Sequence, residues 1–343
     1  MTPDAGPMHS RDSHSFQVPD IDIDIDIRLK PDELRATLIE DVRTGLTATP
    51  RRLSPVWFYD ERGSRLFDEI TRLAEYYPTR TERAILAAHA GAIADLADAD
   101  VLIELGSGTS EKTRLLLDAL SEGGRLGTFV PLDVSEEILR EAAEGIAHAY
   151  PGVAVRAVVG DFHHHLDALP RGGRRLVAFL GGTIGNLTPG ERSRFFFDLD
   201  CQLESGDSFL LGTDLLKSPE RLVAAYNDAQ GVTAEFNLNL LHVLNRELGA
   251  NFVVERFEHV AVWNDEARWI EMRLRSLIDQ RVTIPACDLV VDFAMGDELL
   301  TEISAKFTRA QVTDELAAVG LQLMAAWVDD DEDFLLTLST PYC

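Results

Sequence analysis

The stretch Val101-Leu-Ile-Glu-Leu-Gly-Ser-Gly-Thr109 decides the fold class of this 343-residue chain. Its first five residues have the length and apolar character of a buried strand, and Gly106 and Gly108 allow the backbone to turn tightly and to approach a ligand. The turn lacks the third glycine of a dinucleotide-binding motif, because position 111 is Glu, and no Gly-Lys-Ser or Gly-Lys-Thr of a phosphate loop follows. The stretch therefore predicts a strand that leads into a helix, and it favours neither hydride transfer nor phosphoryl transfer.

Short apolar segments recur downstream of this strand, and segments with helical periodicity separate them. They lie at 128–132, 153–159, 176–180 and 208–212. Strands that alternate with helices predict an α/β fold with a parallel, doubly wound sheet that helices cover on both faces.

The alternation is confined to the middle of the chain. Residues 1–18 are polar, and from Asp20 to Ile27 Asp and Ile alternate with the period of a half-buried strand, although a low-complexity leader is an equal alternative. We therefore expect residues 1–28 to be a disordered or extended tail and assign them no function. The other expected elements are helices from Lys30, at 64–73 and from about Thr81, strands at 257–263 and 269–274, and a helix at 308–319 followed by a strand at 334–338.

Charge and composition exclude several classes of partner. The 32 Lys and Arg residues against 58 Asp and Glu residues give a formal net charge of −26, which repels nucleic acid and anionic lipid surfaces. No apolar run is long enough to span a membrane, and the N-terminal residues lack the apolar centre of a signal peptide. The three cysteines are too far apart in sequence for a disulfide framework or a metal site. We expect a cytoplasmic protein that binds neither nucleic acid nor membranes.

Two clusters of polar residues suggest metal binding but do not support it. The consecutive side chains of His163-His-His165 point in different directions, and no partner at ligand spacing accompanies them. The run Asp329-Asp-Asp-Glu-Asp333 is most simply a solvated acidic loop. We therefore expect no metal.

The ends of the first three strands offer the parts of a nucleoside pocket, because ligands of open α/β sheets bind at the carboxyl ends of the strands. Asp133 ends the second strand and is placed to accept hydrogen bonds from both ribose hydroxyls, or alternatively to cap the next helix. Asp161 and Phe162 follow the third strand and suit the amine and the ring of adenine, or alternatively a turn beside the core. With the glycine turn at 106–108 they form a pocket without a pyrophosphate clamp, which favours S-adenosylmethionine over NAD.

The loop after the fourth strand, FLGGTIGNL (179–187), faces the reactive end of the cofactor in such folds. Thr183 and Asn186 offer neutral donors and acceptors that suit an amino-acid head group. An ordinary polar loop is the alternative.

Long stretches of the chain carry a resemblance to a known family. They include WFYDERGSRLFDEITRLAEYYPTRTE (57–82), LIELGSGTSEKTRLLLDAL (102–120), FLGGTIGNL (179–187), AYNDAQGVTAEFN (225–237) and TEISAKF (301–307). In these motifs the sequence resembles the S-adenosylmethionine-dependent histidine Nα-methyltransferases of ergothioneine biosynthesis (the EgtD family). The resemblance covers roughly residues 30 to 340.

The resemblance implies a class I (Rossmann-like) methyltransferase with a second, α+β substrate-binding domain. Residues 29–79 and 217–305 are expected to form the substrate-binding domain, and residues 80–216 and 306–343 the methyltransferase domain. The implied reaction is the trimethylation of the α-amino nitrogen of L-histidine to hercynine, the first step of ergothioneine biosynthesis. The small-molecule substrates are then histidine and its mono- and dimethyl forms, and we expect a monomer.

The resemblance also implies the residues of the site. The cofactor-binding set comprises Gly106, Ser107, Gly108 and Lys112 at the methionine end, Asp133 at the ribose, and Asp161 and Phe162 at the adenine. In the substrate pocket, Asn186 and Tyr226 face the carboxylate, Tyr59, Phe67, Gly181 and Thr183 surround the amine, Tyr76 lies nearby, Glu302 and Ser304 bind the imidazole, and Met272 packs on the ring. The catalytic candidates among them are Tyr59, Gly181, Thr183 and Asn186.

The chemistry of these residue types agrees with the implied reaction. Aromatic rings such as Tyr59, Phe67 and Tyr76 suit an amine that becomes quaternary and permanently charged, although core packing is the alternative for each. Methyl transfer from a sulfonium mainly requires proximity and orientation, and we identify no dedicated general base.

The sequence is also compatible with two other functions. One is a methyltransferase for tryptophan or a related amine, and the other is a protein that binds S-adenosylmethionine without catalysis. Met272, Glu302 and Ser304 are the positions that distinguish a tryptophan methyltransferase from a histidine methyltransferase.

Overall fold

The computed structural model describes residues 23–342, which contain an eight-stranded sheet with the order β1-β5-β4-β3-β6-β7-β14-β13. The strands from β1 to β7 in this order pair in parallel, whereas β14 pairs antiparallel with both β7 and β13. This sheet confirms the predicted α/β class. Its strands are β1 (Ile23–Ile27), β3 (Val101–Leu105), β4 (Thr128–Asp133), β5 (Ala154–Val159), β6 (Arg175–Phe179), β7 (Ser208–Asp214), β13 (Leu321–Val328) and β14 (Phe334–Pro341).

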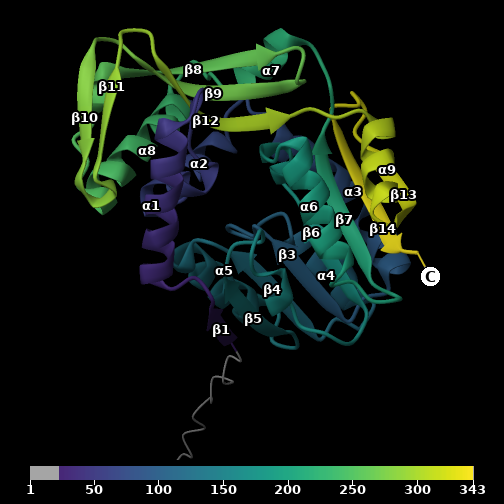
Figure 1. Cartoon of the computed structure of the whole chain (residues 1–343). Helices are drawn as coiled ribbons and strands as arrows, with labels where there is room; N and C mark the ends of the chain where they lie inside the picture. The colour runs from purple at the N-terminus through teal and green to yellow at the C-terminus, as the bar shows by residue number, and fades with distance from the viewer. Residues whose placement is uncertain (1–22, 343) are drawn as a thin grey trace, which may run out of the picture.

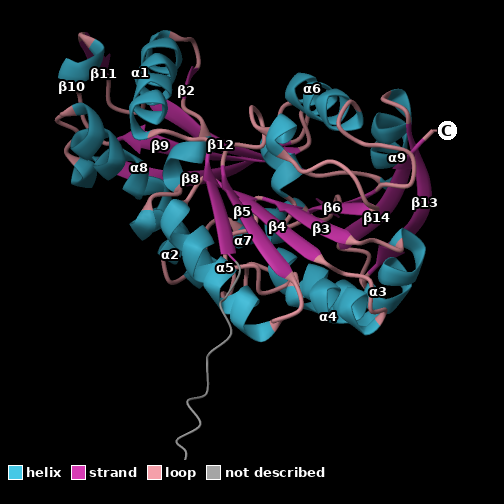
Figure 2. Cartoon of the chain, turned by 90° about the horizontal axis from the view of Figure 1, so that it is seen from below, coloured by secondary structure: helices cyan, strands magenta, loops and turns pink. Residues whose placement is uncertain are grey.

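Helices cover both faces of this sheet, as Figure 2 shows. Leu102 of β3 packs into the core under α3 (Pro78–Ala97), α4 (Arg114–Glu122) and α5 (Glu136–Ala149). Its neighbour Ile103 packs into the core on the opposite face. There the helices are α6 (Pro189–Asp200) and α9 (Arg309–Ala318). Because both faces are buried, the strands are continuous apolar runs rather than alternating ones.

A second unit with its own core lies at one end of this sheet, at the upper left of Figure 1. It contains a four-stranded sheet with the order β2-β12-β9-β8 and a hairpin of β10 and β11. Its strands are β2 (Arg51–Arg52), β8 (Phe257–Asn264), β9 (Trp269–Ser276), β10 (Gln280–Ile284), β11 (Leu289–Phe293) and β12 (Glu298–Ala305). Its helices are α1 (Pro31–Thr47), α2 (Glu61–Ile70), α7 (Pro219–Ala225) and α8 (Val232–Leu248). The core therefore joins the N-terminal helices to the segment that follows β7.

Short 3₁₀ turns connect several of these elements. They are η1 (Pro55–Phe58), η2 (Leu166–Ala168), η3 (Thr183–Asn186), η4 (Val254–Arg256) and η5 (Pro285–Cys287).

The structure differs from the sequence prediction mainly at the starts of helices. The helix α2 begins at Glu61 rather than Ser64, because the Asp60 carboxylate accepts a hydrogen bond from the Gly63 amide and caps it. The helix after β3, which the sequence predicts to begin at Glu111, is α4 and begins at Arg114, because the residues from Ser107 to Thr113 turn before it. Residues 23–27, for which a strand and a leader were equal alternatives, form the edge strand β1, and residues 1–22 lie outside the described part. The strands β2, β10, β11 and β13 were not predicted.

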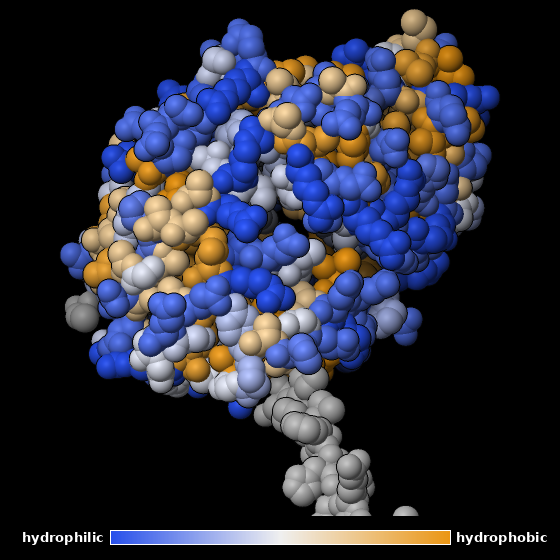
Figure 3. Space-filling view, turned by 180° about the vertical axis from the view of Figure 1, so that it is seen from behind, coloured by the Kyte–Doolittle hydropathy of each residue, from blue (hydrophilic) through white to orange (hydrophobic). Residues whose placement is uncertain are grey.

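Hydrophilic residues occupy much of the molecular face seen in Figure 3. The acidic run near the C-terminus is less solvated than its sequence suggests. Asp333 is 3% exposed and bonds Arg221 at 2.9 Å, and Asp329 caps the backbone amides of residues 333 and 334. Within residues 23–342 no helix has the length and apolarity that crossing a membrane requires.

Candidate active site

A cleft of about 1080 Å³ opens where the carboxyl ends of β3, β4, β5 and β6 face the second unit. Its lining brings together most of the residues that the sequence predicted for the site. These are Gly106, Ser107, Gly108, Lys112, Asp133, Asp161 and Phe162 from the cofactor set, and Tyr59, Phe67, Gly181, Thr183, Asn186 and Glu302 from the substrate set. The other predicted residues are buried just behind this wall: Tyr76, Tyr226, Met272 and Ser304.

The turn after β3 fits a polar ligand. Gly106 and Gly108 have φ angles of 66° and 50°, and a Cβ at either position meets no atom within 4 Å, so both face open space. Between them the Ser107 hydroxyl is buried and has no hydrogen-bond partner. Leaving a buried hydroxyl unpaired costs free energy, so this loop is incomplete without a hydrogen-bonding group beside it.

Asp133, the last residue of β4, binds two backbone amides with its carboxylate. It does not cap α5, whose N-cap residue is Ser135 and which has no side-chain cap. One carboxylate oxygen accepts from the Ser135 amide at 2.9 Å at the start of α5, and the other accepts from the Gly108 amide at 2.8 Å. Burial raises the pKa of Asp133, and these amide donors oppose that rise. Asp133 therefore fixes the turn after β3 and also lines the cleft.

The end of β5 provides a carboxylate beside an aromatic ring. One oxygen of Asp161 accepts from the His163 amide at 2.8 Å. The Phe162 ring lies against Phe179, with 5.0 Å between the ring centroids, and against the His163 ring at 4.5 Å. Phe162 thus has a fixed position at the cleft wall.

Sequence reasoning missed Glu82 of α3, whose side chain is completely buried. Both of its carboxylate oxygens accept from the Gly181 amide, at 2.8 and 2.9 Å, and it forms an ion pair with Lys112. A Cβ at Gly212 of β7 would stand 2.1 Å from one of these oxygens, so the carboxylate occupies the space that this glycine leaves. The signal in the sequence is that Glu82 shares the buried stripe of α3 with Ile85.

Four aromatic side chains form a continuous row along the substrate side of the cleft. The ring centroids are 5.7 Å apart for Tyr59 and Phe67, 6.2 Å for Phe67 and Tyr76, and 6.0 Å for Tyr76 and Tyr226. Phe236 of α8, which sequence reasoning missed, backs this row at 5.8 Å from Tyr59. Burial raises the pKa values of the three tyrosines well above the ordinary value. Their phenols are therefore neutral and are not bases.

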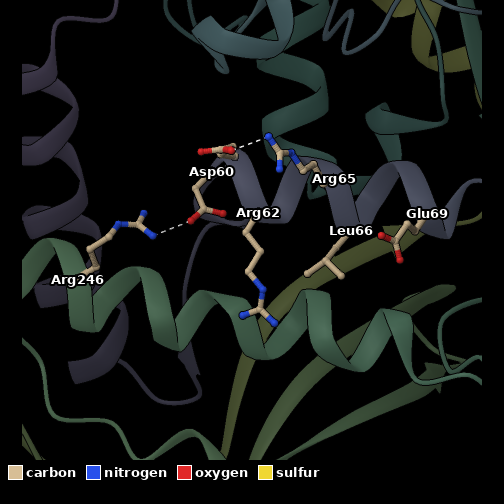
Figure 4. A pocket seen from close by; sticks show the side chains of 7 residues that line it. Asp60, Arg62, Arg65, Leu66, Glu69 and Arg246 are labelled. Atoms are coloured by element: carbon tan, nitrogen blue, oxygen red, sulfur yellow. Dashed lines mark hydrogen bonds and ion pairs between the residues drawn. The ribbon is translucent and has the colours of Figure 1, made fainter.

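Contacts at the N-terminus of α2 fix the position of Tyr59, which precedes this helix. Asp60, the next residue, accepts a hydrogen bond from Asn239 at 2.8 Å and bonds Arg246 of α8 at 2.9 Å, as Figure 4 shows for the arginine. Asp60 and Arg246 also line a separate depression of about 410 Å³, together with Arg62. Within it Asp60 pairs with Arg246 and Glu61 pairs with Arg65, and the first of these ion pairs connects the start of α2 to α8.

Glu302 of β12 is the buried carboxylate at the substrate end. It is 8% exposed and lies opposite Met272 of β9 in the sheet. Burial raises the pKa of Glu302 to about 8, and Lys306 acts in the opposite direction. Two residues along the same strand, the Ser304 hydroxyl contacts the Tyr226 hydroxyl at 2.7 Å.

The loop after β6 places polar groups between the two ends of the cleft. Gly181 has a φ of 82°, and the Thr183 hydroxyl donates to the Leu180 carbonyl at 3.1 Å. Asn186 ends the η3 turn at the cleft wall.

Residues 38–341 match the family model described as histidine-specific methyltransferase, SAM-dependent. This chain belongs to that family. It is therefore an S-adenosylmethionine-dependent methyltransferase, as the sequence motifs predicted.

Individual relatives match most of this chain. The histidine N-alpha-methyltransferase of Mycolicibacterium smegmatis is 54% identical over 311 residues, which are 91% of this chain and 97% of the relative. The protein of the same name from Mycobacterium tuberculosis is 55% identical over 302 residues, 88% of this chain and 94% of its own. The Ergothioneine biosynthesis protein 1 of Neurospora crassa is 33% identical over 82% of this chain and 32% of its own length.

Proposed function

We propose that this methyltransferase trimethylates the α-amino nitrogen of L-histidine to hercynine, through the mono- and dimethyl forms, as the first step of ergothioneine biosynthesis. The observation that carries the proposal is that one cleft joins the incomplete Ser107 turn to a row of aromatic rings and the buried Glu302. The relatives at 54% and 55% identity bear the name of this activity.

The cofactor occupies the part of the cleft at the ends of β3, β4 and β5. Its sulfonium supplies an electrophilic methyl group. The Ser107 hydroxyl and the Lys112 ammonium hold the methionine end, with Gly106 and Gly108 leaving room for it. Asp133 accepts from the ribose hydroxyls, and Asp161 and Phe162 hold the adenine.

The substrate lies between the β6 loop and the second unit. Asn186 and Tyr226 bind the histidine carboxylate, and Glu302 and Ser304 bind the two ring nitrogens. Tyr59, Phe67 and Tyr76 surround the amine, with the Gly181 backbone and the Thr183 hydroxyl beside it. Met272, 2% exposed, closes the pocket behind the ring.

The chain's contribution to the rate is orientation rather than proton transfer. Bringing the amine in line with the methyl group replaces a bimolecular encounter, an effect of about 7–11 kcal/mol in well-oriented systems. The tyrosine phenols around the amine are neutral, so they do not take its proton, and we identify no dedicated general base. Aromatic faces around it stabilise the permanent charge of the trimethylated product.

A methylation assay across the amino acids tests this proposal. Mass spectrometry after incubation with S-adenosylmethionine should show mono-, di- and trimethylhistidine in sequence and only traces of methylated tryptophan. Calorimetry of histidine with and without S-adenosylhomocysteine supplies the binding control. Methylation of tryptophan in preference to histidine overturns the substrate, and binding without turnover overturns the activity.

The organisation of the chain follows from the same assignment. We propose that residues 29–79 and 217–305 form the substrate-binding domain, and residues 80–216 and 306–343 the methyltransferase domain, because their cores are separate. We also propose that the protein is a monomer. The free thiols of Cys201 and Cys287 suit the reducing cytoplasm.

A further inference from the structure

A buried ammonium group lies directly behind the substrate wall. Lys306 follows β12, and its side chain is 0% exposed. Its Nζ is 2.9 Å from the Ser304 Oγ, 3.0 Å from the Tyr226 Oη and 2.8 Å from a carboxylate oxygen of Asp214. Nothing in the assigned function uses this lysine.

The charge of Lys306 has a buried counterion. Burial raises the pKa of Asp214, but the ammonium groups of Lys306 and Lys217 outweigh that effect and hold it below its usual range. The Tyr77 hydroxyl also donates to this carboxylate, at 2.8 Å. An ammonium has three hydrogens and no lone pair. Lys306 has three acceptors within reach, so it donates one hydrogen to each of them.

The hydroxyl groups of Tyr226 and Ser304 carry one hydrogen each. Tyr226 and Ser304 both accept from Lys306, and the 2.7 Å contact between them uses one of their two hydrogens. One hydroxyl hydrogen is left. The hydroxyl that retains this hydrogen already accepts two hydrogen bonds, one from Lys306 and one from the other hydroxyl. It can therefore only donate a hydrogen bond to the substrate. The other oxygen has no hydrogen left and only accepts.

We propose that Lys306 is a positioning residue that makes Tyr226 the hydroxyl donor to the substrate carboxylate and Ser304 an acceptor for an N–H of the substrate ring. This inference rests on the proposed function, in which a carboxylate faces Tyr226. A carboxylate has no hydrogen, so the remaining hydroxyl hydrogen belongs to Tyr226, and Ser304 donates its own to Tyr226. The ring nitrogen beside Ser304 therefore carries a hydrogen, and Glu302 binds the other nitrogen.

This arrangement gives the pocket a preference that shape alone does not supply. A ring without an N–H leaves the Ser304 lone pair unpaired in a buried site, and such sites discriminate strongly against analogues that lack a hydrogen-bonding group. Thienylalanine has a ring of similar size and no N–H. The wild-type enzyme should therefore select histidine over thienylalanine, and Ser304→Ala should reduce the ratio of their kcat/KM values at least fivefold.

The direct test removes the ammonium while keeping the length of the side chain. Lys306→Met should raise the KM for histidine at least tenfold, change kcat less, and leave the affinity for S-adenosylhomocysteine within about twofold. Lys217→Met is the matched control, because it removes the other ammonium beside Asp214 but has no bond to Tyr226 or Ser304 in the described residues. Its histidine KM should stay within about threefold of the wild-type value.

A double variant separates positioning from general damage. If Lys306 acts through Tyr226, then adding Lys306→Met to Tyr226→Phe should raise the histidine KM less than threefold further. The inference is overturned if the increase in histidine KM in the double variant equals the product of the increases in the two single variants. It is also overturned if a folded Lys306→Met variant has an unchanged histidine KM. If Lys306→Met does not fold, an unchanged histidine-to-thienylalanine ratio in Ser304→Ala overturns it instead. Absence of histidine methylation by the wild-type enzyme would be a failure of the proposed function itself.

Discussion

At the scale of single residues, Asp133 shows how one carboxylate serves two neighbours. It holds the amides of Gly108 and Ser135 and still lines the cleft where the ribose is proposed to bind. Removing it therefore disturbs both the turn and the ligand contact.

We expect Asp133→Ala to weaken binding of S-adenosylhomocysteine by about one to two orders of magnitude, because hydrogen bonds to charged groups contribute about 1.5–3 kcal/mol. Titration calorimetry measures the change. Asp133→Asn is the control, since its single carbonyl oxygen keeps part of the acceptor function and should lose less affinity. A folded Asp133→Ala variant with wild-type affinity would contradict the assignment of this residue.

We expect Glu302 to determine specificity for the substrate ring. Glu302→Ala should lower kcat/KM for histidine at least tenfold, because a ring nitrogen loses its partner in a buried pocket. Adding Met272→Val should make room for an indole and raise the relative rate on tryptophan. Parallel kinetics of both amino acids with wild-type and double-variant enzyme measure the preference, and an unchanged preference means that the ring is bound elsewhere.

We also expect Glu302 to make the stability of the folded chain depend on pH. Its pKa is about 8 in the folded chain, against an ordinary value of 4.5. Between these values the folded state retains a proton that the unfolded state releases, so this group lowers stability as the pH rises from about 4.5 to 8. Glu302→Gln removes the effect. Its melting temperature relative to wild type should therefore be higher at pH 8 than at pH 5, and a difference that does not depend on pH would contradict the burial of this carboxyl group.

At the scale of elements, Glu82 joins α3, the turn after β3 and the loop after β6 through its contacts with Lys112 and Gly181. The glycine at position 212 of β7 leaves space for it. The cofactor turn and the substrate loop are thus held by the same carboxylate.

Gly212→Ala should displace this carboxylate, since the new Cβ would stand 2.1 Å from it and 3.1 Å from the Phe334 ring. We expect a lower melting temperature and weaker S-adenosylhomocysteine binding, and partial recovery of both when the shorter Glu82→Asp is added. Thermal unfolding and calorimetry measure them. Gly91→Ala in α3 is the control, because its Cβ meets no atom within 4 Å and alanine favours the helix. A Gly212→Ala variant that behaves like this control would refute the role of Glu82.

At the scale of the whole molecule, the site lies in the cleft between two units with separate cores. The main sheet supplies the cofactor side, and the N-terminal helices together with the segment after β7 supply the aromatic row. In the part of the chain that the structure describes, the acidic side chains grouped closely enough to hold a metal are Asp329, Asp331 and Asp333, and none of them lines the cleft.

The enzyme should convert histidine to its trimethylated form without a metal ion, because the sulfonium of the cofactor already supplies an electrophilic methyl group. Product analysis by mass spectrometry in excess EDTA should match the untreated reaction. Activity that EDTA abolishes and a divalent cation restores would contradict the metal-free reaction, and monomethylhistidine as the final product would contradict trimethylation.

The cofactor side of the site was predictable from the sequence because its residues belong to local motifs. Each strand of a parallel sheet ends at the same edge, so Gly106, Asp133 and Asp161 meet there once the strands are recognised. The substrate residues are scattered from Tyr59 to Ser304. Thr183 and Asn186 were suggested by their loop at a strand end, whereas the others were identified only by the family motifs.

The sequence by itself determined the α/β sheet and the class of cofactor, since strand periodicity and the turns at strand ends are local properties. The tertiary structure alone decided which charges became buried. Glu82 and Lys306 are ordinary charged residues in sequence, and each gained its role from partners far along the chain, such as Gly181 and Tyr226. A buried charge is tolerated only where such partners satisfy it, and their positions depend on how the two units pack.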